Sequence, residues 1–149
     1  VRSRRQRQMC IRDSEGMWHT YLRVADAAQA RVRGVRGASW HNFATGDKGS
    51  FDANELAVAP DTDTVIQGVG PALALLDSAW GRQIHVETTG CPSAVVWNPR
   101  SSSTHADNPT AQAWRDFVCV ETGACKDNAF IVAPHSDLTM STRISVETL

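Results

Sequence analysis

The feature that most constrains this chain is its regular alternation of short strand-forming runs with small clusters of turn-forming residues. The turns are rich in glycine, proline and aspartate, as at residues 46–50, 68–71, 90–92 and 134–137. They recur about every 8 to 15 residues, which is typical of an antiparallel all-β domain. We expect a meander of strands at residues 17–24, 29–35, 55–59, 64–68, 72–77, 82–88, 93–97, 115–122, 128–132 and 138–146.

The last of these runs has the clearest alternation of apolar and polar residues. Its alternate positions are Leu138, Met140, Thr142, Ile144 and Val146, with polar side chains between them. Successive side chains of a strand point to opposite faces, so we expect one buried face and one solvated face here.

One connection is long. Residues 98–113 are mostly polar, and residues 108–114 are compatible with one helical turn that has Pro109 at its first position. Loops of this length often carry function.

The charge distribution argues against a nucleic-acid-binding surface. The chain has 15 Lys and Arg residues against 16 Asp and Glu residues. Residues 1–16 hold five of the basic and two of the acidic residues, so the remainder has ten basic and fourteen acidic residues. An acidic body lacks the basic patch that nucleic acids require. No apolar run is long enough to cross a membrane, and we expect a cytoplasmic protein.

Residues 1–16 are treated separately from the domain at residues 17–149. They contain five arginines and no hydrophobic periodicity, which is typical of a disordered basic tail. The segment looks like linker or adapter sequence joined to a truncated gene, and we leave it out of the fold prediction.

The cysteines give no sign of a metal site or a disulfide framework. No Cys-x-x-Cys pair occurs among them, and their spacing to the five histidines does not form a zinc motif. We therefore expect free thiols, no metal and no cofactor. The four residues are Cys10, Cys91, Cys119 and Cys125.

Two polar residues in β-type runs are candidates for acid–base chemistry. His19 should share a strand face with Met17 and Tyr21, and Glu121 should share one with Cys119 at the end of an apolar strand. A half-buried structural histidine and a solvent-facing strand-end glutamate are the ordinary alternatives. A glutamate that faces a pocket would instead need partners to set its pKa, which would make it a candidate acid or base.

Four segments together resemble the hexose-6-phosphate mutarotases, also called glucose-6-phosphate 1-epimerases, of the galactose-mutarotase-like superfamily. The segments are WHTYL at 18–22, PDTDTV at 60–65, AVVWNP at 94–99 and FVCVE at 117–121. Their order and spacing match that family from about Met17 to the end. The resemblance implies a β-sandwich of the supersandwich type, of which this chain would form the C-terminal half.

The resemblance also implies roles for three residues. His19 and Glu121 match the catalytic histidine and glutamate of the family, and Asp63 matches an aspartate that contacts the sugar. Thr64 and Ile66 stand where arginine and tyrosine are usual, so the strand around Asp63 departs from the family pattern.

The implied reaction is the interconversion of α and β anomers of a hexose 6-phosphate. Glu121 would take the proton of the C1 hydroxyl and His19 would protonate the ring oxygen, and the ring would then close on its other face. The family's phosphate-binding arginines lie largely in the other half of the domain. We expect a monomer for the full-length protein, and little activity and poor solubility for residues 17–149 alone.

Two alternatives stay open at this point. One is an aldose 1-epimerase that acts on unphosphorylated sugars with the same acid and base. The other is a non-catalytic carbohydrate-binding sandwich.

Other polar residues are weaker candidates. Arg31 and Arg33 share strand parity, and a solvated strand face is the simpler interpretation of both and of Arg36. His41 and Asn42 could line a sugar pocket, and Trp97 could stack on a pyranose ring. These three are also compatible with core or rim positions.

Overall fold

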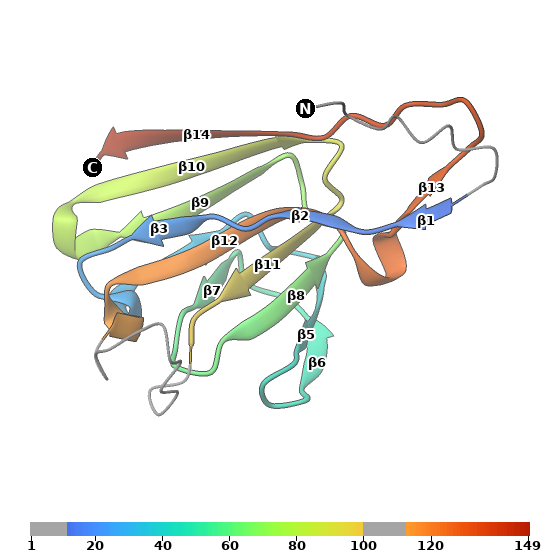
Figure 1. Ribbon diagram of the computed structural model, residues 1–149. Helices are drawn as coiled ribbons and strands as arrows, with labels where there is room; N and C mark the ends of the chain where they lie inside the picture. Colours follow the sequence, from blue (N-terminus) through green and yellow to red (C-terminus); the bar gives the residue numbers. More distant parts are fainter. Residues whose placement is uncertain (1–11, 100–112) are drawn as a thin grey trace.

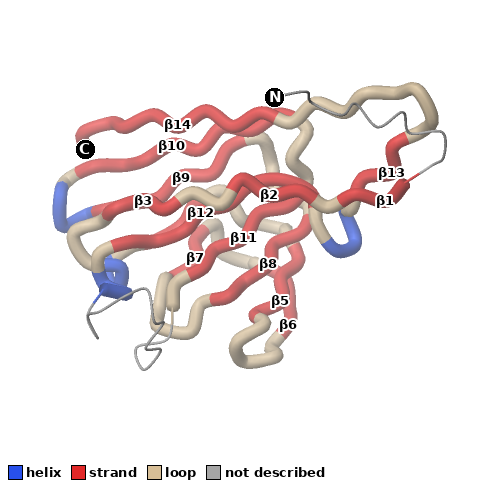
Figure 2. Tube along the Cα trace, in the orientation of Figure 1, coloured by secondary structure: helices blue, strands red, loops and turns tan. Residues whose placement is uncertain are grey.

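The protein is a β-sandwich of antiparallel strands in a computed structural model that describes residues 12–99 and 113–149 (Figure 1). The strands are β1 (Arg12–Ser14), β2 (Gly16–Trp18), β3 (Tyr21–Arg23), β4 (Arg31–Arg33), β5 (Ser39–Asn42), β6 (Lys48–Ser50), β7 (Glu55–Ala57), β8 (Asp63–Gln67), β9 (Ala72–Asp77), β10 (Arg82–Thr89), β11 (Ser93–Trp97), β12 (Phe117–Ala124), β13 (Phe130–Val132) and β14 (Ser141–Thr148). Single 3₁₀ turns are η1 (Ala27–Gln29), η2 (Ser78–Trp80), η3 (Ala113–Arg115) and η4 (Lys126–Asn128). The all-β prediction is confirmed, as the preponderance of strand in Figure 2 shows.

Two sheets make up the sandwich. The smaller has the strand order β14-β10-β9-β4-β7. The larger has the order β2-β12-β11-β8-β5-β6, with β3 also paired to β12. A separate two-stranded ribbon joins β1 to β13.

The expected meander is wrong, because the chain passes repeatedly from one sheet to the other. The hairpin β9–β10 lies in the smaller sheet, whereas β8 before it and β11 after it lie in the larger. The crossings use Gly68 and Gly90, which have φ angles of 75° and 70°. A Cβ on Gly90 would lie 2.5 Å from the carbonyl oxygen of Thr139, so glycine is required there. At each crossing, the strand before the glycine and the strand after it lie in opposite sheets and pack against the same core.

The hydrophobic core lies between the two sheets. It determines which side chains of each strand are buried and which point away from the core. The larger sheet contributes buried side chains from alternate positions of β8, β11 and β12, and the smaller sheet contributes those of β4, β9 and β10. These residues are Ile66, Ala94, Val96, Val118 and Val120, opposed by Val32, Leu73, Leu75, Ile84 and Val86. Because strand side chains alternate, the other set on β8, β11 and β12 faces away from this core.

The last strand does not have the buried face that its sequence predicts. β14 is the outer strand of the smaller sheet and pairs only with β10 (Figure 1). Ile144 and Val146 are 42% and 60% exposed. The strand itself agrees with its sequence pattern, but within the described residues its apolar side is covered only at its start, where Thr142 contacts Thr122, and is exposed at Ile144 and Val146.

This exposed strand predicts self-association. The 149-residue chain should elute from a size-exclusion column as oligomer or aggregate, because an apolar strand at a sheet edge favours pairing between molecules. The double substitution of Ile144 and Val146 by lysine should shift it toward monomer, while Ser145→Lys on the same strand should change elution less. A monomeric wild-type peak would contradict this expectation.

Residues 12–16 belong to the folded structure. Arg12–Ser14 pair antiparallel with Phe130–Val132, and the side chain of Glu15 accepts a hydrogen bond from the backbone N–H of Lys126 at 2.6 Å. Residues 1–11 of the expected tail and most of the long connection lie outside the described residues. No helix in the described ranges is long and apolar enough to cross a membrane.

Candidate active site

Strand pairing brings His19 and Glu121 opposite each other. β2 and β3 pair with β12 in one continuous register, with Trp18 opposite Thr122 and Tyr21 opposite Cys119. His19 lies between the two pairings and therefore faces Glu121. The distance from His19 Nδ1 to Glu121 Oε1 is 3.1 Å. Two residues distant in sequence are thus cross-strand neighbours in hydrogen-bonding distance on the outer face of the larger sheet.

Aromatic rings hold the histidine in place. The His19 ring stacks on Tyr21 with 4.9 Å between centroids, as expected for residues on one face, and its edge meets Trp97 at 6.1 Å. Phe117 contacts both Tyr21 and Trp97. The side chain of His19 is 48% exposed and that of Glu121 is 12% exposed. The imidazole is therefore reachable from solvent, while the carboxylate lies deeper.

A buried asparagine fixes the strand ends that carry these rings. The side-chain amide of Asn98 donates to the backbone carbonyls of Trp114 and Phe117 at 2.7 and 2.8 Å. The backbone N–H of Asn98 donates to the carbonyl of Thr62. The end of β11 is thereby tied to the start of β12. Trp97 and Phe117 are held side by side as a result.

The electrostatics of Glu121 suit a proton-accepting group. Burial raises the pKa of its carboxyl, the His19 imidazole opposes that rise, and the negative charge of Asp63 adds to it. Beneath the rings, burial raises the pKa of the Cys119 thiol to about 12, and Glu121 contributes to that shift. Cys119 is therefore a protonated, unreactive thiol, and Glu121 is the group in the pair whose basicity the fold enhances.

All three residues predicted from sequence line one pocket. It has a volume of about 410 Å³. Its lining residues are His19, Phe43, Asp63, Val65, Val95, Trp97, Glu121 and Lys126. Asp63 is the cross-strand partner of Trp97, which places it on the same face as Glu121. Within residues 12–99 and 113–149, no cluster of three or more potential ligands could hold a metal ion.

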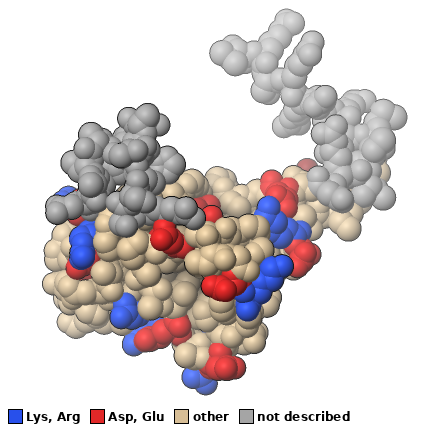
Figure 3. All heavy atoms as spheres, turned by 90° about the horizontal axis from the view of Figure 1, so that it is seen from below, with Lys and Arg blue, Asp and Glu red and all other residues tan. Residues whose placement is uncertain are grey.

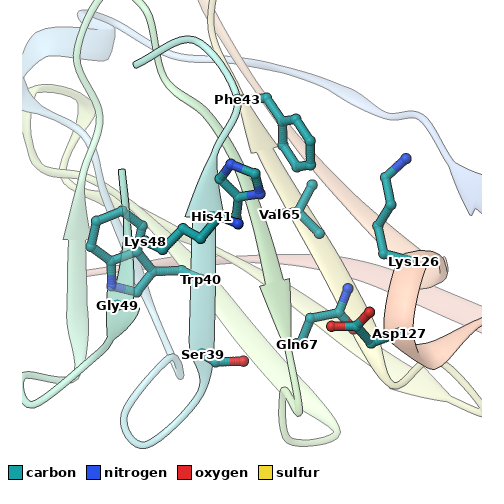
Figure 4. A pocket seen from close by; sticks show the side chains of 10 residues that line it. All are labelled: Ser39, Trp40, His41, Phe43, Lys48, Gly49, Val65, Gln67, Lys126 and Asp127. Carbon is teal, nitrogen blue, oxygen red and sulfur yellow. The ribbon is translucent and has the colours of Figure 1, made fainter. Parts of the chain in front are cut away.

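A second pocket of about 390 Å³ lies on the same face of the sheet (Figure 4). It shares Phe43, Val65 and Lys126 with the first. Its remaining lining residues are Ser39, Trp40, His41, Lys48, Gly49, Gln67 and Asp127. The two pockets therefore lie next to each other on the larger sheet, and we call them together the groove.

Of the other polar and aromatic candidates from the sequence, some line the pockets and some make structural contacts elsewhere. His41 lines the second pocket and Trp97 the first. Asn42 instead stabilises a turn, because its side chain accepts from the N–H of Ala44 at 2.9 Å. Arg33 forms an ion pair with Glu55 at 2.6 Å on the smaller sheet, in agreement with the solvated interpretation.

Phe43 and Lys126 also line the first pocket, although no sequence pattern predicts a role for either residue. Phe43 follows β5, and its N–H donates to the carbonyl of Asp63 at 2.7 Å. Lys126 follows β12 in a turn without a recognisable motif. On the face of the molecule shown in Figure 3, Lys and Arg side chains lie among Asp and Glu side chains, without a patch of one sign.

Comparison with solved structures shows which fold this is. The sandwich superposes on the crystal structure of "a putative mutarotase (YeaD) from Salmonella typhimurium" with a TM-score of 0.82 over 94% of the chain, at 19% identity. This is the galactose-mutarotase-like fold. A second structure of this fold, described as a "Putative aldose 1-epimerase" from Escherichia coli K12, gives a TM-score of 0.68 over 96% of the chain at 19% identity.

A curated sequence supports the same resemblance. The chain is 26% identical over 109 residues to the "Putative glucose-6-phosphate 1-epimerase" of Cenchrus ciliaris. That match covers 72% of the chain and 33% of the relative, and the chain spans 48% and 53% of the two solved structures. No protein-family model matches the chain. The resemblance to the glucose-6-phosphate 1-epimerases that the four motifs indicate is thus supported independently.

Proposed function

We propose that this chain carries the acid–base site of an enzyme that interconverts the α and β anomers of a hexose 6-phosphate. The observation that carries the proposal is the 3.1 Å contact between His19 and Glu121 within a pocket that also contains Asp63. The fold and the relatives' printed names support sugar anomer interconversion in general. The preference for a phosphorylated sugar follows the motif resemblance and the curated relative. We also propose that the protein is located in the cytoplasm.

The chemistry requires one group to accept a proton and another to donate one. Glu121, as carboxylate, takes the proton from the C1 hydroxyl while protonated His19 gives a proton to the ring oxygen, and the C1–O5 bond breaks to form the open-chain aldehyde. After rotation about C1–C2, neutral His19 takes the proton back from the C5 hydroxyl. Protonated Glu121 returns its proton to the C1 oxygen as the ring closes on the other face.

The geometry leaves atoms free for the sugar. The contact between the two side chains uses Nδ1 of His19 and Oε1 of Glu121. The sugar then contacts Nε2 of His19 and Oε2 of Glu121, and the Asp63 carboxylate can accept a hydrogen bond from a ring hydroxyl. Trp97 lines the same pocket and can offer the sugar an aromatic face. No cofactor takes part in this scheme.

The test is an NMR exchange measurement of anomer interconversion, made on the full gene product that contains this sequence. Glucose 6-phosphate should exchange faster than in buffer alone and faster than glucose. Faster exchange of glucose would favour an aldose 1-epimerase for unphosphorylated sugars. Exchange of both sugars at the buffer rate would reject catalysis and leave a carbohydrate-binding sandwich.

The raised pKa of Glu121 predicts a pH dependence. The general base must be deprotonated, so kcat/KM should fall as pH drops through the pKa of Glu121, with a midpoint above the ordinary value of 4.5. Asp63→Asn removes a negative charge that raises this pKa, so the midpoint should move to lower pH. Asp52→Asn, at an exposed position outside the groove, should leave the midpoint unchanged. A shift to higher pH with Asp63→Asn would contradict the assignment.

A further inference from the structure

The buried side chain of Asn98 connects two segments whose aromatic residues meet at the first pocket. Asn98 directly follows Trp97, the last residue of β11, and is 1% exposed. Its amide donates to the carbonyls of Trp114 and Phe117, which lie in η3 and at the start of β12 (Figure 1). Asn98 is not itself a lining residue of the pocket. Any effect that it has on the reaction must therefore pass through its neighbours.

The backbone and the side chain of Asn98 make different connections. The backbone N–H donates to the carbonyl of Thr62 at 2.7 Å and continues the pairing of β11 with β8. Any residue except proline can make this bond. The bonds to the start of β12 need a side chain with N–H donors that reach both carbonyls. Substitution of Asn98 should therefore loosen β11 from β12 and leave its connection to β8 in place.

Trp97 depends on this connection because it stands at the end of its strand. The ends of secondary-structure elements open more readily than their centres. The indole ring packs against the Phe117 ring with 6.0 Å between centroids, and its edge meets the His19 ring at 6.1 Å. Phe117 is the first residue of β12, and its own carbonyl accepts from Asn98. Asn98 thus holds both packed rings through the backbones that carry them.

The acid–base pair is held by other contacts. His19 stacks on Tyr21. Glu121 lies in the interior of β12, away from the end of the strand that Asn98 binds. Loss of the Asn98 amide should therefore disturb the position of Trp97 more than the approach of the acid and the base.

We propose that Asn98 is a positioning residue that fixes the Trp97 ring as the surface on which the sugar ring packs. This inference rests on the proposed function for the placement of a sugar in the first pocket. Trp97 lines that pocket, and a flat indole face suits the C–H groups of a pyranose. A ring that is already held in place loses less conformational entropy when the sugar binds. Asn98 therefore raises affinity for the sugar through Trp97.

The test is isothermal titration calorimetry of the full gene product with glucose 6-phosphate. Asn98→Leu removes both donated bonds and should weaken binding about threefold to tenfold, the effect of releasing one large side chain. Trp97→Leu should weaken binding at least as much. Because Asn98 acts through Trp97, the double variant should bind within about twofold of Trp97→Leu alone.

The exchange measurement shows whether proton transfer is spared. Over a range of glucose 6-phosphate concentrations, Asn98→Leu should raise KM in step with the loss of affinity. Its kcat should stay within about threefold of wild type, because the lost contact contributes to binding in the ground state and the transition state alike.

Asp77→Asn is the control for a general loss of stability. Asp77 is a 2% exposed residue of the smaller sheet that accepts hydrogen bonds from the Ala25 N–H and from Arg82. Its substitution should lower the thermal unfolding midpoint, as Asn98→Leu does, but leave the affinity for glucose 6-phosphate unchanged. If Asn98→Leu does not fold, Asn98→Ser removes the amide with a smaller side chain and serves for the same comparison.

Unchanged affinity in the folded Asn98 variant would overturn the proposal. So would a loss confined to kcat, a double variant whose loss is the product of the two single losses, or an equal loss with Asp77→Asn. Absence of glucose 6-phosphate binding by the wild type would overturn it as well. Failure of the proposed reaction is seen separately, as exchange at the buffer rate by a wild-type protein that still binds the sugar.

Discussion

Replacing Glu121 with glutamine should lower the rate of anomer interconversion about 10²- to 10⁴-fold in the full gene product, because the amide cannot accept the proton of the C1 hydroxyl. The substitution keeps the size of the side chain, so sugar binding should change little. An NMR exchange measurement at saturating glucose 6-phosphate gives the rate, and calorimetry gives the affinity. Together they separate loss of chemistry from loss of binding.

The chain supplies a matched control for this substitution. His85 and Glu147 form a second histidine–glutamate pair, with 2.8 Å between Nε2 and Oε2, on the smaller sheet. Glu147→Gln removes the same charge from the same kind of pair outside the groove and should leave the exchange rate unchanged. If Glu121→Gln also leaves the rate unchanged, the pocket is a sugar-binding or structural site and the enzyme assignment is wrong.

Replacing His19 with asparagine should cause a second loss of similar size, about 10²- to 10⁴-fold, because the ring oxygen then leaves without a proton donor. Asparagine cannot exchange a proton with the sugar near neutral pH. His85→Asn is the matched control and should retain full activity. A His19→Asn variant with wild-type turnover would show that the imidazole only packs between Tyr21 and Trp97.

The double variant reports whether the two residues act as one unit. If Glu121 and His19 move protons in the same ring-opening step, removing both should cost little more than removing the more important one. Losses that simply multiply would indicate separate roles in binding or folding. The same exchange measurement serves for all three variants.

The strand content of this chain is predictable because each strand keeps its own hydrophobic pattern. The runs that became β8 to β12 have enough β-branched and apolar residues to be recognised locally. β5 and β6 are not predictable in this way, since Ser39–Asn42 and Lys48–Ser50 are short and rich in polar residues and glycine. Their place in the sheet comes from pairing with β8, which is a tertiary effect.

Strand order and burial could not be predicted in the same way. Periodicity shows that Ile144 and Val146 share a face, but not whether another layer covers that face. Gly68 and Gly90 indicate turns in the sequence. They do not indicate that the chain crosses into the opposite sheet at each of these turns. Both properties depend on contacts between segments that local patterns do not describe.

The candidate site was predictable through its motifs and the parity of its strands. Strand parity placed Glu121 with Cys119 and His19 with Tyr21, and the family resemblance paired His19 with Glu121 as candidate catalytic residues. The 3.1 Å contact follows from the register of β2, β3 and β12, which sequence alone does not give. Lys126 had no signal at all, because its position depends on Glu15 and Gln67, which are remote in sequence.

The most direct test is a crystal structure of the Glu121→Gln full gene product with glucose 6-phosphate bound. The account predicts a single pyranose in the pocket of His19, Asp63 and Trp97. Its C1 hydroxyl should lie within hydrogen-bonding distance, about 3 Å, of the side chain at position 121, and its ring oxygen should lie equally close to the imidazole. A sugar bound elsewhere, or one whose anomeric carbon points away from both side chains, would contradict it.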